Sequence, residues 1–254
     1  MIKVSGIKYK VRIIKTFELE LELELELKFF PTTNNEYMSF KNQIEFLKEL
    51  QKNNAKEWMD ANRKWYKQVR DEYIDWLNSM NKRLADIDDE YYDTPGKKGI
   101  NRINNNLMFH PNKPVYKDHF GAGFDKKPKT ADFYFELGIE RCVFAGGLWR
   151  PESKVLRSIR DAIDYDGEEL VKILNKKSFK NRFGNLFEDA KLTNAPKGFA
   201  KDHKHIELLK NKTFAVFQEF DTKETNKANF DDELINAYKE MLPFRRYLNK
   251  AITV

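Results

Sequence analysis

Apolar residues recur at helical spacing in two stretches that follow residue 38. Ser39 is placed to cap the first helix, because a Ser hydroxyl can accept from a free amide of the first turn. After Asn53-Asn54, a stripe from Trp58 to Ile87 recurs every three or four residues and predicts one long amphipathic helix with Asn62 as its polar member. We interpret this aromatic stripe as core packing and not as a ligand box. The first helix is predicted from four residues: Phe40, Ile44, Leu47 and Leu50.

Strand-forming residues dominate the middle of the chain. Asp132–Ile139 and Cys142–Trp149 predict an antiparallel hairpin that turns at Glu140-Arg141. Gly146-Gly147 inside the second strand indicates a bulge or a close approach of another part of the backbone. Phe214–Phe220 predicts a further strand.

Helical patterns resume after the hairpin. Pro151-Glu152 suits the opening of a helix, because Pro fits the first turn and Glu complements the helix dipole. Helices that bracket a small, mainly antiparallel sheet with a central hairpin predict an α+β fold. The other predicted helices are Glu168–Lys176, Ile206–Leu209 and Phe230–Ala251, the last kinked or broken at Pro243.

Residues 1–37 differ from the rest of the chain. Glu18–Leu27 reads ELELELELEL, and this two-residue period favours a strand with one Leu face and one Glu face. The alternative is a low-complexity extension that does not belong to the folded domain. We expect residues 38–254 to form a single α+β domain, and a chain that begins at Met38 to fold as well as the full chain.

Composition narrows the function classes only broadly. The chain has 254 residues, 41% hydrophobic and 34% charged, with a net charge of +6, which is typical of a globular protein with a heavily charged surface. Its single cysteine, Cys142, excludes an intramolecular disulfide and favours a cytoplasmic location; its apolar surroundings indicate an inert thiol. We expect no membrane partner, since no segment has the length and hydropathy of a membrane span or the pattern of an export signal.

Two stretches, Lys98–Phe124 and Ala145–Pro151, follow neither a helix nor a strand period and are rich in basic, aromatic, Gly and Pro residues. Irregular segments of this kind often carry binding sites. We expect them to share one concave, positively charged wall that binds an anionic ligand, either phosphate-bearing or nucleic acid. The alternative is that the cations pair with acidic residues and the aromatic side chains complete the core. The candidate binding residues are Arg102, Lys113 and Lys117 for charge, Tyr116 and Trp149 for stacking, and His119 and Arg150 as secondary contacts.

Two other function classes remain open from the sequence. An enzyme could use Asp202 to orient His203 as a general base beside Lys117 or Tyr116. This requires His203 to share a pocket with Arg102 or Lys117. A protein-interaction module would instead present an apolar patch on the terminal helix, formed by Leu234, Tyr238, Met241 and Leu242.

Common cofactor and catalytic signatures are missing from the sequence. We find no GxxxxGK[ST] phosphate loop, HExxH, GxSxG or GxGxxG motif. His203 and His205 are separated by one residue, so both could face one metal ion from an extended chain. Two histidines without further ligands are weak evidence for a metal site. We therefore favour exposed histidines, with Asp202 capping the next helix, and predict no metal site. No cofactor follows from the residues.

Five pieces of the chain resemble the family catalogued as domain of unknown function DUF 2461, over about residues 40–220. The resemblance implies no activity, cofactor or substrate. The matching pieces are NNAKEWMDANRKWY (Asn53–Tyr66), INRI (Ile100–Ile103), PNKPVYKDHFGAGF (Pro111–Phe124), FAGGLWRPE (Phe144–Glu152), and APKGFAKDH with IELLK (Ala195–His203 and Ile206–Lys210).

The chain also departs from the family pattern. Where the family commonly reads like RI-x-RD-x-RF, Asn105, Asn106 and Met108 replace charged residues. An Asn can neither take a proton as a carboxylate does nor clamp an anion as a guanidinium does. If the family's charged cluster is catalytic, this chain is impaired. If the cluster is a structural ion-pair network, neutral replacements are tolerated, and the departure favours this second interpretation.

Overall fold

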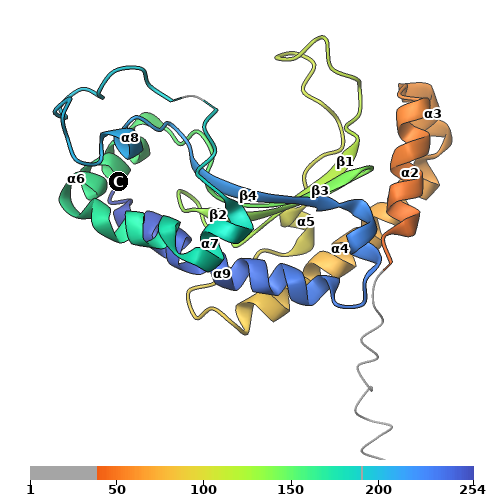
Figure 1. The fold of residues 1–254 in the computed structure, drawn as a ribbon. Helices are drawn as coiled ribbons and strands as arrows, with labels where there is room; N and C mark the ends of the chain where they lie inside the picture. Colours follow the sequence, from red (N-terminus) through yellow and green to blue (C-terminus); the bar gives the residue numbers. More distant parts are fainter. Residues whose placement is uncertain (1–38, 190) are drawn as a thin grey trace, which may run out of the picture. The chain divides into compact units, whose positions relative to one another are not determined.

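The computed structural model, which describes residues 39–189 and 191–254, has a four-stranded antiparallel sheet at its centre (Figure 1). The strands are adjacent in chain order, so each pairs with the next one along the sequence. The fold is α+β, as predicted, and the hairpin is confirmed. The strands are β1 (His119–Phe124), β2 (Asp132–Gly138), β3 (Arg141–Leu148) and β4 (Phe214–Asp221).

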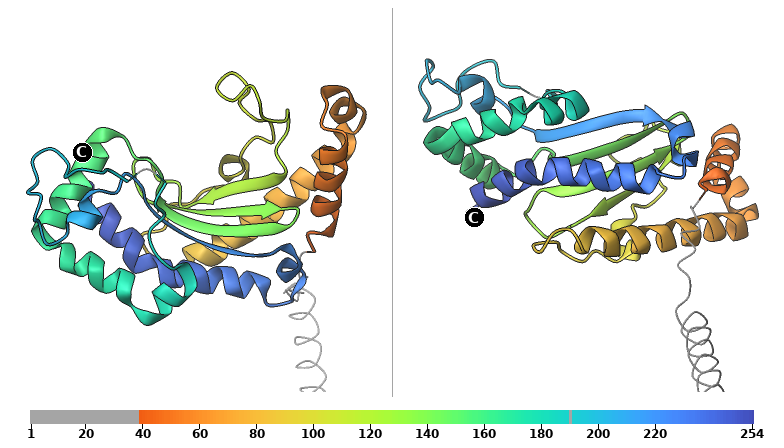
Figure 2. Two further views of the ribbon diagram at one scale, coloured as in Figure 1. Left: turned by 45° about the horizontal axis from the view of Figure 1, so that its top comes forward. Right: turned by 60° about the horizontal axis from the view of Figure 1, so that its bottom comes forward.

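Helices cover one face of the sheet (Figure 2). The core on this face is aromatic: Trp76 of α4 and Phe230 of α9 contact Phe135 of β2, with ring centroids 5.2 and 5.8 Å apart. The aromatic stripe therefore serves the core, as expected. The helices are α2 (Lys41–Lys52), α3 (Lys56–Ala61), α4 (Arg63–Ala85), α5 (Gly96–Gly99), α6 (Ser153–Asn175), α7 (Lys177–Phe183), α8 (Ile206–Leu209) and α9 (Phe230–Ala251), with a 3₁₀ turn η1 (Thr222–Asn226).

The prediction of one long helix from Trp58 to Ile87 is wrong at Asn62, and the helix also ends at Ala85, two residues before Ile87. Asn62 leaves the helical region at φ −104° and ψ 19°, which separates α3 from α4. Its side-chain Nδ2 donates to the Trp58 carbonyl at 2.9 Å, and its backbone N–H donates to the same carbonyl at 3.0 Å, so Asn62 supports the end of α3. The Ser39 cap is also wrong: Phe40 occupies the N-cap of α2, and no side chain among residues 39–189 and 191–254 caps that helix.

The irregular stretch Lys98–Phe124 contains a strand that the sequence did not predict. Residues His119–Phe124 form the edge strand β1, paired with β2 from His119–Gly138 to Phe124–Phe133. The sequence of β1 shows no alternation of apolar and polar side chains. Gly121 and Gly123 occupy the positions on the less covered face of the sheet, and neither carries a side chain. The short helix α5 and the helix α7 were likewise not predicted.

The helical predictions after the hairpin hold with two changes. The segment predicted as a separate helix from Glu168 is continuous with α6 and is offset only by a break at Asp166, where φ is −146° and ψ is 61°. The terminal helix α9 runs through Pro243 without a break. The strand Phe214–Phe220 and the short helix Ile206–Leu209 are confirmed.

The close approach expected at Gly146-Gly147 is present. A Cβ at Gly146 would collide with Met241 of α9, and Gly147 adopts φ +116°, which favours glycine. The prediction for residues 1–37, including the Leu-Glu strand, lies outside the described residues. None of the described helices combines the length and apolar character needed to cross a bilayer.

Candidate binding site on the open face of the sheet

The second face of the sheet is not covered by α4 and α9, and it carries polar and aromatic side chains. Strand residues alternate between faces, so Phe133 and Phe135 enter the core while Tyr134 and Glu136 point to the other side. This face forms the floor of a trough of about 500 Å³. Its lining includes Asp132, Tyr134, Glu136, Arg141, Val143, Ala145, Trp149, Phe187, Phe217 and Glu219.

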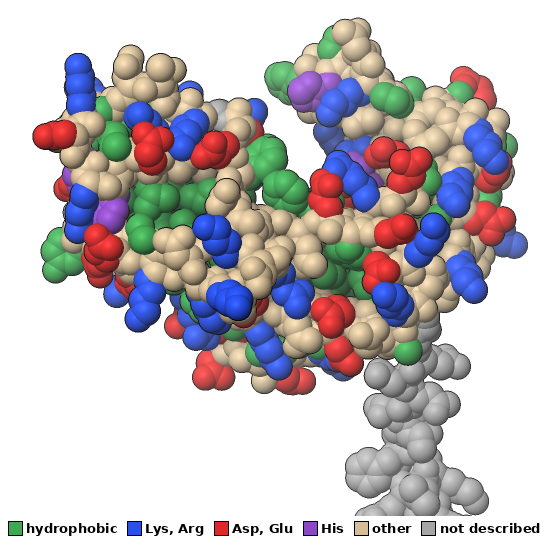
Figure 3. All heavy atoms as spheres, in the orientation of Figure 1, with side chains coloured by type: hydrophobic (Ala, Val, Ile, Leu, Met, Phe, Trp, Pro, Cys, Tyr) green, Lys and Arg blue, Asp and Glu red, His purple; other side chains and the backbone are tan. Residues whose placement is uncertain are grey.

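The segment of residues 100–118, here called the finger, rises from β1 beside α2 and α3 at one end of the sheet (Figures 1 and 2). It folds back on itself as an irregular hairpin: Asn105 N donates to Val115 O and Lys117 N to Ile103 O, both at 2.9 Å. A bridge joins Asn104 and Tyr116. Figure 3 shows a hollow between the finger and the opposite lobe, with basic, acidic and histidine side chains along its finger side.

Side chains from the α2–α3 junction hold the finger in place. Asn54 bonds both backbone groups of Tyr116: its Oδ1 accepts from Tyr116 N at 2.8 Å, and its Nδ2 donates to Tyr116 O at 3.0 Å. Gln51 Nε2 donates to Lys117 O at 2.9 Å. The Asn54 amide thus replaces a neighbouring strand, which explains how an irregular segment keeps a defined position.

Three predicted cations lie on this finger. Arg102 and Lys113 are exposed, and Lys117 is half-buried with its Nζ donating to the Arg102 carbonyl at 2.7 Å. Burial, and then the positive charge of Arg102 and Lys113, lowers the pKa of Lys117, while Glu136 acts in the opposite direction. Within residues 39–189 and 191–254, none of the three cations forms an ion pair with a carboxylate. The finger therefore carries three cations that have no ion-pair partner in the described part of the chain.

Tyr116 does not take the position that stacking requires. Its side chain is 4% exposed and its ring completes the packing beneath the finger, so no face is free for a ligand. Burial raises the pKa of Tyr116. The alternative interpretation, in which this aromatic residue belongs to the core, describes it correctly.

His119 belongs to a chain of polar side chains across β1 and β2. Its Nδ1 is 2.8 Å from Asp118 Oδ1, and its Nε2 is 3.6 Å from Glu136 Oε2. The same Glu136 oxygen accepts from the Tyr134 hydroxyl at 3.0 Å. The bond from His119 lowers the pKa of Asp118, and burial raises that of Tyr134 well above its ordinary value. The sequence did not single out Tyr134 or Glu136, although the alternation in DFYFELG marks both as facing away from the core.

Trp149 and Arg150 lie at the other end of the trough. His119 pairs with Gly138 at the end of β2, close to the turn that leads into β3 at Arg141. Trp149 follows Leu148, at the opposite end of β3. Seven steps along β3 correspond to about 23 Å at ~3.3 Å per residue. The expectation that one wall unites both irregular stretches is therefore wrong for a small ligand.

The environment of these two residues also differs from that of the finger. Trp149 is 57% exposed and packs on Phe187 with ring centroids 4.8 Å apart. Arg150 Nε bonds Asp189 Oδ2 at 2.6 Å, so its charge already has a partner. Trp149 remains available for stacking, but Arg150 is less suited to an incoming anion than the finger cations.

The pair Asp202 and His203 lies apart from this site. His203 Nε2 contacts Asp164 Oδ1 of α6 at 3.0 Å, and its Nδ1 accepts from His205 N at 3.0 Å. These contacts join His203 to α6 and to the N-cap of α8, and both helices lie across the molecule from the finger (Figures 1 and 2). The enzyme alternative required His203 to share a pocket with Arg102 or Lys117, and this geometry does not provide it. His203 is also not simply exposed, because Asp164 and the backbone hold both ring nitrogens.

The apolar patch expected on the terminal helix is absent from α9. Leu234, Tyr238 and Met241 are fully buried and Leu242 is half-buried, so the four residues do not form an exposed patch. The large apolar side chains that are exposed lie mainly elsewhere, notably Met108 and Phe109 at the finger tip.

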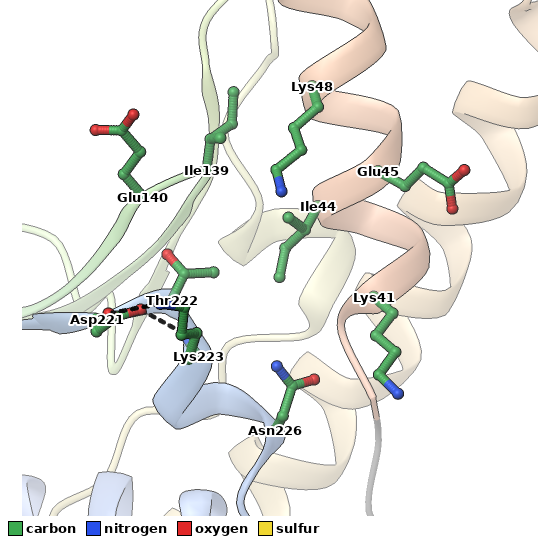
Figure 4. Close-up of a pocket in the computed structure, with 10 residues that line it drawn as sticks. All are labelled: Lys41, Ile44, Glu45, Lys48, Ile139, Glu140, Asp221, Thr222, Lys223 and Asn226. Carbon is green, nitrogen blue, oxygen red and sulfur yellow. Dashed lines mark hydrogen bonds and ion pairs between the residues drawn. The ribbon is translucent and has the colours of Figure 1, made fainter.

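A second cavity of about 600 Å³ lies between α2, the β2–β3 turn and η1 (Figure 4). Lys48 directs its ammonium group into the space between Ile44 and Ile139, while Glu45 points away from it. Asp221 accepts from the Lys223 backbone at 2.8 Å at the opposite wall. Lysines and carboxylates are balanced in this lining, so it offers no excess of either charge. The lining residues are Lys41, Ile44, Glu45, Lys48, Ile139, Glu140, Asp221, Thr222, Lys223 and Asn226.

Within the described part of the chain, no group of three or more His, Cys, Asp or Glu side chains could hold a metal ion.

The family described as "Conserved hypothetical protein (DUF2461)" matches residues 42–247. The chain belongs to this family. Comparisons with curated proteins and with solved structures found no match. The description of the family assigns no activity, so the comparison brings neither a ligand nor a reaction.

The residues that depart from the family pattern lie on the finger. Asn105 Nδ2 donates to Pro114 O at 2.9 Å, and Asn106 O accepts from His110 N at 3.0 Å. The Asn105 side chain therefore supports the finger through a neutral hydrogen bond, whereas the Asn106 contact is made by its backbone carbonyl and does not depend on its side chain. Met108 is 80% exposed at the tip of the finger. The side-chain contact of Asn105 agrees with a structural role for that position in this chain.

Proposed function

We propose that this protein binds a small ligand that carries one anionic group, with the anion on the finger cations and the body of the ligand on the floor of the trough. The observation that carries the proposal is the group formed by Arg102, Lys113 and Lys117. Burial lowers the pKa of Lys117 most, and the positive charges of Arg102 and Lys113 lower it further, while no described carboxylate forms an ion pair with any of the three. Bringing like charges together costs free energy that a bound anion would recover.

The charge of the floor favours a small ligand over a nucleic acid. Asp132, Glu136 and Glu219 line the trough, and Arg141 is paired with Glu219. A phosphate backbone that ran along this floor would meet carboxylates at several points. A ligand with a single terminal anion avoids this repulsion, because only its head reaches the finger.

Phenyl phosphate, with phenol as the uncharged counterpart, is a suitable first probe for titration calorimetry. We expect phenyl phosphate to bind and phenol to bind far more weakly. Hydrogen bonds to charged groups contribute about 1.5–3 kcal/mol each, so Arg102→Ala or Lys117→Ala should weaken binding by about 10- to 100-fold. The matched control is Lys201→Ala, which removes an exposed lysine on the opposite lobe and should leave the affinity unchanged.

Two results would overturn this proposal. One is equal affinity of the native protein, Arg102→Ala and Lys117→Ala for phenyl phosphate. The other is a short single-stranded oligonucleotide that binds more tightly than phenyl phosphate with a steep salt dependence, which would point to a nucleic-acid surface.

A further inference from the structure

The tip of the finger, residues 107–109, exposes three consecutive large apolar side chains. Met108 is 80% exposed, Phe109 68% and Leu107 37%. A folded monomer commonly exposes single apolar residues, whereas a contiguous apolar group is typical of a surface that binds a partner. The finger rises away from the sheet, so its tip projects from the molecule (Figures 1 and 2). The tip is therefore placed to contact another molecule and not the core of its own.

The trough has the form of a groove along β3. Ala145 of β3 pairs with Tyr134 of β2 and with Phe217 of β4, and directly paired residues direct their side chains to the same face. Two large rings therefore flank a row of small residues that lines the trough: Val143, Ala145 and Gly147. Beyond the end of this row, Trp149 is 57% exposed. The volume of about 500 Å³ lies in the range of cavities that enclose a drug-sized molecule, so the groove has room for two side chains of a finger tip.

The finger and the trough carry opposite net charge. Residues 100–118 hold the three finger cations and one carboxylate, Asp118, which gives a net charge of +2. The lining of the trough holds three carboxylates and one cation, which gives −2: Asp132, Glu136, Glu219 and Arg141. Opposite charge on two surfaces favours their encounter and fixes how they meet. Since every copy of the chain brings both surfaces, a second copy supplies a partner that matches the trough in apolar character and in charge.

We propose that the trough binds the finger tip of a second copy of this chain. Met108 and Phe109 of the second copy would lie on the row of small residues along β3, with the finger cations near the trough carboxylates. Tip and trough are different surfaces, so the contact closes into a dimer when two chains exchange fingers and extends into larger assemblies when they do not. The inference does not rest on the proposed function. A tip in the trough and a ligand on its floor exclude each other, so self-association would close the ligand site at high protein concentration.

Sedimentation equilibrium of the full chain without ligand, from micromolar to submillimolar concentration, tests this inference. We expect the average mass to rise with concentration, and the association to weaken with added salt because salt screens the opposite charges. Met108→Ser combined with Phe109→Ser should weaken the association by about tenfold or more, since two large apolar side chains lose their burial. Trp149→Ala should weaken it as well. The matched control is Tyr165→Ser, which removes a 94% exposed aromatic side chain from α6 and should leave the association unchanged.

Disulfide cross-linking identifies the two surfaces that meet. The single native cysteine, Cys142, is buried, so a cysteine introduced at an exposed position is the reactive thiol. With oxidised glutathione, a mixture of Phe109→Cys and Trp149→Cys chains should form disulfide-linked pairs faster than either variant alone. The matched control mixes Phe109→Cys with Tyr165→Cys, and it should cross-link no faster than the separate variants.

Three results would overturn the inference. The first is a native chain that stays monomeric over the whole concentration range. The second is association that persists in the tip variant or in Trp149→Ala, because the contact would then lie elsewhere. The third is Phe109→Cys that cross-links as fast alone as in the mixture with Trp149→Cys, which would indicate contact between two tips. Each of these results leaves the proposed function standing, because calorimetry measures phenyl phosphate binding separately.

Discussion

Asn54 is the residue on which the position of the finger depends most directly. Its amide makes two bonds to the Tyr116 backbone, at 2.8 and 3.0 Å, and a third to Gln51 Oε1 at 3.0 Å. Replacement by Ala removes all three and leaves both backbone groups of the buried Tyr116 without this partner. At about 0.5–1.5 kcal/mol for each net hydrogen bond, partly recovered by water, we expect a loss of about 1–3 kcal/mol.

For a folded unit of this size, each kcal/mol lowers the melting temperature by about 2–4 °C. Asn54→Ala should therefore melt about 2–12 °C below the native protein. Hydrogen exchange is the sharper assay, since it reports on the finger separately. The amides of Asn105, Tyr116 and Lys117 should exchange faster, because the bonds that hold the finger hairpin loosen with it.

Asn53→Ala is the matched control. Asn53 is the neighbouring residue of the same type, but its side chain bonds Glu49 O at 3.0 Å at the end of α2 and does not touch the finger. It should leave exchange in the finger unchanged. Asn54→Asp keeps the acceptor for Tyr116 N and loses the donor, so its effect should be intermediate. Unchanged exchange in Asn54→Ala would refute the claim that this amide positions the finger.

Four further predictions concern stability and charge. Burial raises the pKa of Cys142 to about 11, so Cys142 of the native protein should resist iodoacetamide at pH 8 and react readily in urea. Because the pKa in the folded state lies above the ordinary 9.0, the free energy of unfolding, compared with that of Cys142→Ala, should fall between about pH 9 and 11. Arg245→Met leaves Asp125 buried without its ion-pair partner and should cost about 3–5 kcal/mol in urea unfolding, while adding Asp125→Asn should recover part of it. Because the pKa of Lys117 is lowered, phenyl phosphate affinity should weaken with rising pH before the ordinary lysine value of 10.5 is reached, and Lys117→Arg should move that loss to higher pH. A chain that begins at Met38 should melt at the temperature of the full chain, and a large decrease would show that residues 1–37 contribute to the fold.

Local patterns predicted those elements whose side chains alternate clearly between core and solvent. Phe133, Phe135 and Leu137 alternate with polar residues, so β2 and its hairpin with β3 could be identified. In β1 the alternation is lost, because Gly121 and Gly123 occupy the outward positions. The break at Asn62 was missed because the apolar period continues across it, and only the backbone angles of this one residue depart from the helix.

The candidate site was only partly predictable for a different reason. Arg102, Lys113 and Lys117 could be chosen by residue type, and the finger brings them together. The separation of Trp149 from them depends on strand order, which residue type does not reveal. Likewise, the contact between His203 and Asp164 joins residues 39 positions apart in different helical regions, so the nearby Asp202 was a plausible but incorrect choice of partner.

In our proposal, the finger cations and the floor of the trough form one site for a small anion. The most direct test is an amide chemical-shift titration of the isotope-labelled protein with phenyl phosphate. We expect saturable shifts confined to residues 100–118 and to the neighbouring positions of β1, β2 and β3. Shifts confined to α6 and α8 or to the cavity beside α2, or no saturable shift at millimolar phenyl phosphate, would contradict it.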